Sequence, residues 1–167
     1  MQTNRYNLFV VILGLTLFLP SCMKHGLDDN LPKFKDALIT DVFMEYRFED
    51  ATATSGGSPV VRIVSLGISN KQFLKKEDTP GAAADSVVFD VTVPPASGAF
   101  TTVERDKVTK EKIVLMSNIS TAATMEPLEG APRAGVPGDF SQPRKYKVTA
   151  ADGSSRTWIV RIAGFIK

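Results

Sequence analysis

The strongest constraint on the fold is a period of two in the apolar residues, which recurs in several short stretches of the chain. The clearest case is SVVFDVTVP at 86–94, where Val87, Phe89, Val91 and Val93 alternate with more polar neighbours. Such alternation is typical of a β-strand with one buried face and one exposed face. We find no convincing amphipathic helix after the first 30 residues, so the sequence predicts an all-β fold.

Two strands are predicted near the start of the folded region. In ITDVFMEYRF at 39–48, Val42, Met44, Tyr46 and Phe48 share one face, and Asp41, Glu45 and Arg47 occupy the other. The next apolar stretch is VVRIVSLGI at 60–68, and ATATSGGSP at 51–59 separates the two. We interpret them as an antiparallel pair joined by a loop longer than a tight hairpin.

The second half of the chain contains further strands. TTVERDKVTKEK at 101–112 and IVLMSNI at 113–119 predict one or two of them, followed by a loop rich in proline and glycine at 120–143 with a short strand near Met125 and Leu128. Residues 145–162 predict two strands joined at Asp152-Gly153, a dipeptide that favours a hairpin turn. About seven strands in a chain of this length favour one antiparallel β-sandwich at 37–167.

The last of these segments carries a resemblance. DFSQPRKYKVTAADGSSRTWIVRI at 139–162 resembles the closing hairpin of immunoglobulin-like and cadherin-like sandwich modules of Bacteroidales surface lipoproteins. The matching positions are Phe140, Pro143, Tyr146, Val148, Thr149, Ala150, Asp152, Gly153 and Ser154. The resemblance implies an Ig-like sandwich of the kind encoded beside glycan-capture proteins or adhesins. It is looser over 85–138, and the order of the strands in 95–143 stays open.

The N-terminus predicts export. Arg5 precedes an unbroken apolar run from Leu8 to Leu19, as in a signal peptide. The run ends at Pro20 after about twelve residues, and a membrane-spanning helix needs about twenty. Leu19, Ser21 and Cys22 resemble the lipobox of bacterial lipoproteins, which implies cleavage after residue 21 and acylation of Cys22. The alternative is an ordinary signal peptide followed by an unrelated cysteine.

Acylation would tie the mature chain to the outer membrane, since two or three acyl chains make a stable anchor. Residues 22–36 are polar and predict a tether between the lipid and the folded domain. Asp28 and Asp29 resemble the acidic signal that sends Bacteroidetes lipoproteins to the cell surface. A solvated linker with two acidic residues explains them equally well.

Catalytic chemistry finds little support in this composition. His25 in the tether is the single histidine and Cys22 the single cysteine, so an intramolecular disulfide, a Cys/His metal cage and a histidine-activated nucleophile are not expected. Acidic pairs such as Glu45 with Glu49 fit solvated strand faces better than a glycosidase site. The formal net charge is +2 without a basic cluster, which argues against nucleic-acid binding. We therefore expect no enzyme activity, no cofactor and no metal.

Binding remains the preferred class of function. Exposed aromatic rings stack on sugars, and the loop aromatics Phe73, Phe100 and Phe140 are the candidate ligand contacts, with 130–143 as a possible rim. Trp158 shares a strand face with Val160 and Ile162, so we interpret it as core. Asp85-Ser86-Val87 resembles the short acceptor that Bacteroidetes use for O-glycosylation, which makes Ser86 a candidate modification site; a solvent-facing strand start is the alternative.

Three functional hypotheses follow. The first is a non-catalytic lipoprotein, anchored in the outer membrane and facing the exterior, that assists glycan capture or adhesion, with polysaccharide or another surface protein as partner. The second is a structural or protein-interaction module, such as a stalk, an assembly partner or a pilus-associated subunit. The third is a hydrolase facing the periplasm, which would require a close, buried pair of carboxylates.

Overall fold

The computed structural model describes residues 33–167, and strands dominate this part of the chain, which confirms the all-β prediction. Its strands are β1 (Ile39–Ser55), β2 (Ser58–Leu74), β3 (Asp85–Thr92), β4 (Ile113–Ile119), β5 (Thr124–Leu128), β6 (Pro137–Gly138), β7 (Arg144–Thr149) and β8 (Ser155–Ile166). Three short helical segments lie between them: η1 (Lys76–Asp78), α2 (Thr102–Asp106) and η2 (Lys110–Lys112).

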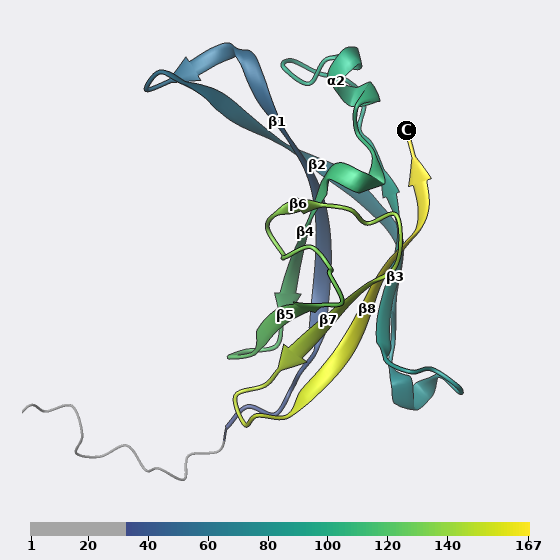
Figure 1. The fold of residues 1–167 in the computed structure, drawn as a ribbon. Helices are drawn as coiled ribbons and strands as arrows, with labels where there is room; N and C mark the ends of the chain where they lie inside the picture. The colour runs from purple at the N-terminus through teal and green to yellow at the C-terminus, as the bar shows by residue number, and fades with distance from the viewer. Residues whose placement is uncertain (1–32) are drawn as a thin grey trace, which may run out of the picture. The chain divides into compact units, whose positions relative to one another are not determined.

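The eight strands of residues 33–167 form one mixed sheet that curls into a half-barrel (Figure 1). Their order is β5-β7-β8-β3-β2-β1-β4-β6, and β3 and β8 run parallel. This pairing differs from the expected antiparallel Ig-like sandwich of about seven strands. The reason is that alternation identifies a strand and its buried face but not its neighbour, and a curled sheet buries one face without a second sheet.

The sheet bends within β2. Residues 58–66 of this strand pair with β1, and residues 67–74 pair with β3. The second half is irregular between Ser69 and Gln72, where Asn70 has a φ of 51°. Such irregularities increase local twist and bend a strand, so they allow one strand to belong to both walls of the half-barrel.

The inner face of the half-barrel is the core. Its largest fully buried side chains include Trp158, Tyr146, Phe89 and Met44, which come from four different strands. The core position expected for Trp158 is therefore confirmed. Its indole N–H donates a hydrogen bond of 3.0 Å to the Ala37 carbonyl, so burying the ring leaves no polar group unpaired.

The proline- and glycine-rich segment covers the open side of this core. Ala131 and Phe140 are buried with the core residues, and the Tyr146 hydroxyl donates a 2.8 Å hydrogen bond to the Pro132 carbonyl. At Gly138 a Cβ would lie 2.3 Å from the Cβ of Pro132, so no side chain fits there. The short strand expected near Met125 is present as β5. The segment thus covers part of the core, as the second sheet of a sandwich would.

The first hairpin is longer than the sequence predicts. Residues 51–59, expected to form a loop, continue both strands to a two-residue turn at Gly56-Gly57, where φ is 60° and 81°. Positive φ at both central positions is the requirement of the tightest hairpin turns, and glycine meets it without strain. The sequence did not predict this turn, because the small residues around Gly56-Gly57 are also typical of an irregular loop.

Of the one or two strands expected from 101–119, one is present. Residues 113–119 form β4, and residues 101–112 contain α2 and η2 rather than a strand. The Thr101 side chain accepts a 3.2 Å hydrogen bond from the Glu104 amide, which caps the first turn of α2. Among these residues only Val108 is buried, so the stretch lacks the buried face that a core strand needs.

The closing hairpin is present as expected. Gly153 has a φ of 90° in the β7–β8 turn, and the Asp152 carboxylate accepts the Ser154 amide at 2.8 Å. The Phe34 and Lys35 carbonyls accept hydrogen bonds of 3.2 Å from Asp152 N–H and the Ser154 hydroxyl. The end of the predicted tether therefore lies along this turn. The signal peptide at 1–21 with Leu19 and Ser21, the lipidation site Cys22, and Asp28 and Asp29 lie outside the described residues.

Candidate functional site

The aromatic residues expected to contact a ligand have different positions. Phe100 and Phe140 are 6% and 2% exposed, and they anchor their loops to the core. Their rings cannot offer a face to a ligand, because packing covers them. Phe73 is 39% exposed and makes an edge contact with Trp158, with ring centroids 6.5 Å apart. The three rings do not gather into one site.

A groove exists elsewhere, where β1 and β2 separate. The two strands pair as far as Met44 and Leu66, and β2 then leaves to pair with β3 from Gly67 onward. The first residues of β1 and the second half of β2 therefore do not pair with each other. The space between them is a groove of about 500 Å³, which we call the β1–β2 groove.

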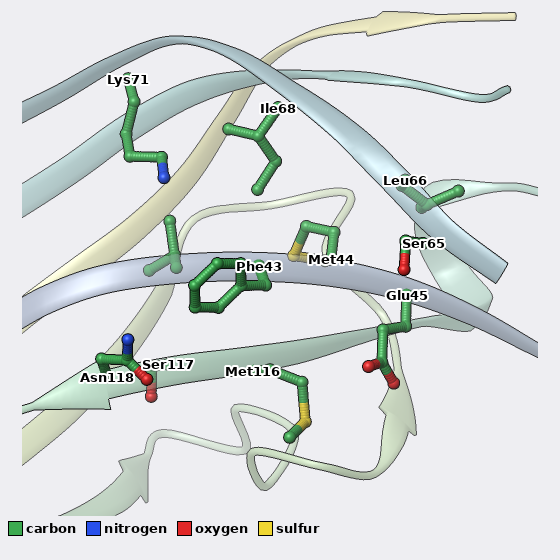
Figure 2. Close-up of a pocket in the computed structure, with 11 residues that line it drawn as sticks. Phe43, Met44, Glu45, Ser65, Leu66, Ile68, Lys71, Met116, Ser117 and Asn118 are labelled. Carbon is green, nitrogen blue, oxygen red and sulfur yellow. The ribbon is translucent and has the colours of Figure 1, made fainter. Parts of the chain in front are cut away.

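The groove has a mixed lining (Figure 2). Apolar side chains come from β1, β2 and β4, and polar groups lie around them. The lining residues are Val42, Phe43, Met44, Glu45, Ser65, Leu66, Ile68, Lys71, Met116, Ser117 and Asn118. Phe43 and Met116 are 45% and 37% exposed, so their apolar surfaces are accessible in the groove. An accessible ring beside amide, hydroxyl, carboxylate and ammonium groups is suited to binding a polar ligand.

One end of the groove is charged. Lys71 forms an ion pair with Asp41, and its ammonium lies 5.6 Å from the centre of the Phe43 ring. The Asp41 carboxylate also accepts the Val42 amide at 2.9 Å, which satisfies backbone exposed where the strands part. The hydrogen bond from Lys71 holds the pKa of Asp41 below its usual range. The ion pair thus fixes the position of the Lys71 side chain at this end of the groove.

The other end is held by Arg47. Its guanidinium donates to the Glu45 carboxylate at 2.9 Å and to the Gly135 carbonyl at 2.9 Å. These bonds tie the proline- and glycine-rich segment to the outer face of β1. Glu45, which lines the groove, is therefore part of an ion pair.

Sequence reasoning missed Phe43 as a candidate. The signal was present, because Phe43 lies between Val42 and Met44 and so falls on the polar face of its strand with Asp41 and Glu45. A large aromatic residue on a solvated strand face is more informative than one in a loop, since no packing requirement explains it.

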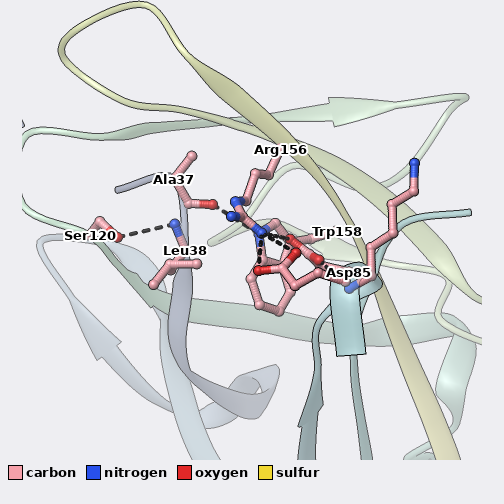
Figure 3. A network of polar contacts seen from close by, with 8 residues as sticks. Ala37, Leu38, Asp85, Ser120, Arg156 and Trp158 are labelled. Carbon is pink, nitrogen blue, oxygen red and sulfur yellow. Dashed lines mark hydrogen bonds and ion pairs between the residues drawn. The ribbon is translucent and has the colours of Figure 1, made fainter. Parts of the chain in front are cut away.

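A second polar cluster lies at the start of β3 (Figure 3). Asp85 is buried, accepts the Lys76 amide at 2.7 Å, and lies 3.3 Å from the Arg156 guanidinium. Arg156 also donates to Glu77 at 2.9 Å, and this bond lowers the pKa of Glu77. The cluster joins η1 to β8. Next to it, Ser86 is half-buried in the middle of the sheet, and its glycosylation stays a prediction.

Glu104 is a further carboxylate that forms an ion pair. The hydrogen bond from Lys107 lowers the pKa of Glu104, which also accepts the Tyr46 hydroxyl at 2.7 Å. Burial and this bond raise the pKa of Tyr46.

Within residues 33–167 no three His, Cys, Asp or Glu side chains are grouped to hold a metal ion. No helix among these residues is long and apolar enough to cross a membrane.

The fold and the groove define a small all-β domain with an open, mixed-lining site. Residues 39–161 match the DUF5018-related family, and the chain belongs to that family. A crystal structure of a candidate secreted protein from Bacteroides fragilis has the same fold, with a TM-score of 0.69 and 32% sequence identity. The match covers 81% of this chain and 100% of that one. No curated protein matches the chain.

Proposed function

We propose that this chain is a non-catalytic lipoprotein of the bacterial outer membrane, anchored through Cys22, that faces the exterior and binds polysaccharide in the β1–β2 groove as an accessory to glycan capture or adhesion. The similarity to a candidate secreted protein of Bacteroides supports a location outside the cytoplasm. The lipobox-like residues Leu19, Ser21 and Cys22 support the anchor.

The accessible Phe43 ring is the observation on which the binding proposal depends most. It lies in a groove of about 500 Å³, a size typical of small-ligand sites, and is 45% exposed. A sugar ring stacks its C–H face on such a ring, while Asn118, Ser65 and Lys71 are suited to hydrogen bonds with hydroxyl groups. The absence of catalysis is supported by the composition, since His25 is the single histidine and Cys22 the single cysteine of the chain.

The binding test is affinity electrophoresis in native gels that contain soluble polysaccharides. The probes are dextran, galactomannan, xyloglucan and polygalacturonate, so that neutral and acidic chains are both represented. We expect at least one of them to retard the wild-type protein and Phe43→Ala to abolish the retardation. Phe73→Ala is the matched control, because Phe73 is a similarly exposed ring outside the groove, and it should bind normally. Lack of retardation by all four probes, or loss with Phe73→Ala alone, would reject the groove as the site.

The location has its own test. Metabolic labelling with palmitate should mark the wild-type protein and not Cys22→Ala. Protease treatment of whole cells should then remove the labelled domain. An unlabelled wild type would refute the anchor, and a labelled domain that resists the protease until the cells are broken would refute the outward orientation.

The second candidate function, a protein-interaction module, is favoured by a different part of the molecule. The outer end of the first hairpin extends beyond the strands that flank it (Figure 1). Free strand edges of this kind accept a strand from another chain.

A further inference from the structure

The outer end of the β1–β2 hairpin is a two-stranded ribbon. On one side, β4 ends its pairing at Ile113 opposite Tyr46. On the other side, β3 begins its pairing at Gly67. Residues 47–55 and 58–63 therefore pair only with each other within the described chain. Two-stranded ribbons are marginally stable by themselves, and each has two edges with unpaired backbone groups.

The two edges are not equivalent. The β1 edge is interrupted between Asp50 and Thr54, where the Asp50 carboxylate accepts the Thr52 hydroxyl at 2.6 Å and the Thr52 amide at 3.0 Å. A bulge of this kind blocks the addition of a strand. On β2 the pairing from Val60 to Leu66 is regular, so its edge is straight and competent to pair.

The exposed side chains of this edge are apolar. Val61 and Ile63 are 57% and 58% exposed, and both lie on the outer face of β2. No lysine and no proline interrupts residues 60–64, although such residues commonly protect an edge. Arg62 is the one charged residue of this stretch and is paired with Asp50, so the regular edge with high β-propensity favours the addition of another strand.

The sequence of the edge is complementary to itself. The stretch Val60-Val61-Arg62-Ile63-Val64 has apolar residues at matching distances on both sides of Arg62. An antiparallel pair of copies centred on Arg62 places Val61 opposite Ile63 of the other copy and Val60 opposite Val64. Such pairs of β-branched residues stabilise a sheet, so the register centred on Arg62 is favoured over its neighbours.

The charge at the centre is already neutralised. Each Arg62 guanidinium lies 3.0 Å from the buried carboxylate of Asp50 in its own chain. Two arginines facing each other across the pair therefore bring two ion pairs together rather than two free cations. An unpaired arginine at the same place would oppose self-association, since like charges directly opposite destabilise a strand pair.

No strand pairs with β2 on this side before Gly67, so the edge is free in the plane of the sheet within the described chain. On the side of the sheet where Phe48 packs, the loop Ser97–Phe100 lies beside Arg62–Val64 and leaves a gap of about 270 Å³. This gap gives room for side chains of a second strand rather than for its backbone.

We propose that two copies of this chain associate through their β2 edges, antiparallel and centred on Arg62, to form a continuous four-stranded ribbon. The partner is a second copy because the edge is complementary to itself in side-chain pattern, and its central charge is neutralised within each chain. This interface is separate from the β1–β2 groove and does not depend on polysaccharide binding.

The test is sedimentation equilibrium of the processed chain, residues 22–167, with Cys22→Ser to prevent thiol cross-linking. We expect this protein to associate into a dimer as its concentration rises to about 100 μM. For Ile63→Lys we expect the dissociation constant of the dimer to rise at least roughly tenfold. Phe34→Lys is the matched control, because Phe34 is an apolar residue 57% exposed, similar to Ile63, and lies beside the β7–β8 turn rather than the β2 edge. It should remain dimeric. A monomer throughout, or a dimer unaffected by Ile63→Lys, would overturn the proposal.

A mixing experiment tests the register. Val61→Glu and Ile63→Lys should each be monomeric alone. Their mixture should recover a dimer, because the carboxylate introduced at position 61 then faces the ammonium introduced at position 63 of the other copy. Failure to recover the dimer when both variants keep the wild-type circular dichroism spectrum would reject the pairing centred on Arg62. If either variant is misfolded, Val61→Thr with Ile63→Thr, which keeps β-branched side chains, should still weaken the dimer, and an unchanged dimer would count against the proposal.

Discussion

The two long hairpins of this domain have the same local structure and opposite surroundings. In the β7–β8 hairpin, Tyr146, Val148, Trp158 and Val160 are all almost completely buried, and the turn is hydrogen-bonded to residues 34 and 35. In the outer end of the β1–β2 hairpin, Val61 and Ile63 are more than half exposed, and a Cβ added at Gly56 or Gly57 of the turn would meet no atom within 4 Å.

The difference shows how the chain divides its strands between stability and binding. Burial of apolar area supplies most of the folding free energy, so the closing hairpin must be a main source of stability. The outer end of the first hairpin contributes less burial: Phe48 and Val64 pack against the core, but Val61 and Ile63 are more than half exposed. Substitutions in the two hairpins should therefore have effects of different size and kind.

The largest expected effect is at Trp158. Trp158→Ala removes the largest side chain of the core and its hydrogen bond to Ala37, and should lower the free energy of unfolding by about 3–5 kcal/mol. Urea denaturation followed by circular dichroism measures this change. Ile63→Ala, in the other hairpin, should change the stability of the monomer by less than about 0.5 kcal/mol. Equal costs for both substitutions would remove the distinction between the hairpins.

The next effect concerns the buried carboxylate beside the closing hairpin. Asp85→Asn leaves the acceptor for the Lys76 amide but removes the charge that pairs with Arg156, and should cost about 1–3 kcal/mol. Glu77→Gln is the control, since Glu77 is about half exposed and pairs with the same arginine. Its cost should stay below about 1 kcal/mol. A larger loss for Glu77→Gln than for Asp85→Asn would contradict the assignment of Asp85 as the structural partner.

A smaller and more local effect is expected at the turn of the first hairpin. Gly57 has a φ of 81°, so Gly57→Ala should weaken the outer end of the hairpin by about 1 kcal/mol. Faster amide exchange in residues 50–62, with unchanged urea denaturation, would show it. Gly67→Ala is the comparison, because its added Cβ meets Thr92 at 3.5 Å, an ordinary contact, without a positive φ. A global loss of stability from Gly57→Ala would mean that this end is part of the main folding unit.

The smallest effect concerns pH. Hydrogen bonds from the Thr52 hydroxyl and amide, followed by that from Arg62, lower the pKa of Asp50. Because the folded pKa lies below the unfolded value of about 3.9, this carboxylate stabilises the bulge above about pH 4, and the contribution is lost as the pH falls through the folded pKa. A carboxyl-carbon NMR titration should show Arg62→Gln raising the Asp50 midpoint. Lys145→Gln, which breaks a remote ion pair with Glu129, should leave it unchanged.

The sequence was sufficient for the parts of the fold that depend on local pattern. Alternation identified β3, β7 and β8 and the burial of Trp158, and Asp152-Gly153 marked the closing turn. It could not identify the parallel pairing of β3 with β8, because that contact joins segments far apart in the sequence and leaves no local signal. The bend of β2 was also hidden, since Asn70 and the irregular pairing around it have no strict sequence signature.

The candidate site was predictable only in principle. The expected loop aromatics Phe100 and Phe140 pack inward, because a loop closes over a core by inserting such a side chain. Phe43 could have been found from its position among charged residues on a strand face. The groove itself depends on where β1 and β2 stop pairing, which is a property of the sheet topology.

The division of the molecule into a closing hairpin that stabilises the fold and a first hairpin whose outer edge is covered by a second copy can be tested in one experiment. Amide hydrogen exchange measured by mass spectrometry at two protein concentrations addresses both parts at once. We expect amides of β8 to be the slowest and independent of concentration, and amides of residues 60–65 to be protected at high concentration and released on dilution. Exchange in 60–65 that is equal at both concentrations, or faster exchange in β8 than in the outer end of the first hairpin, would contradict this division.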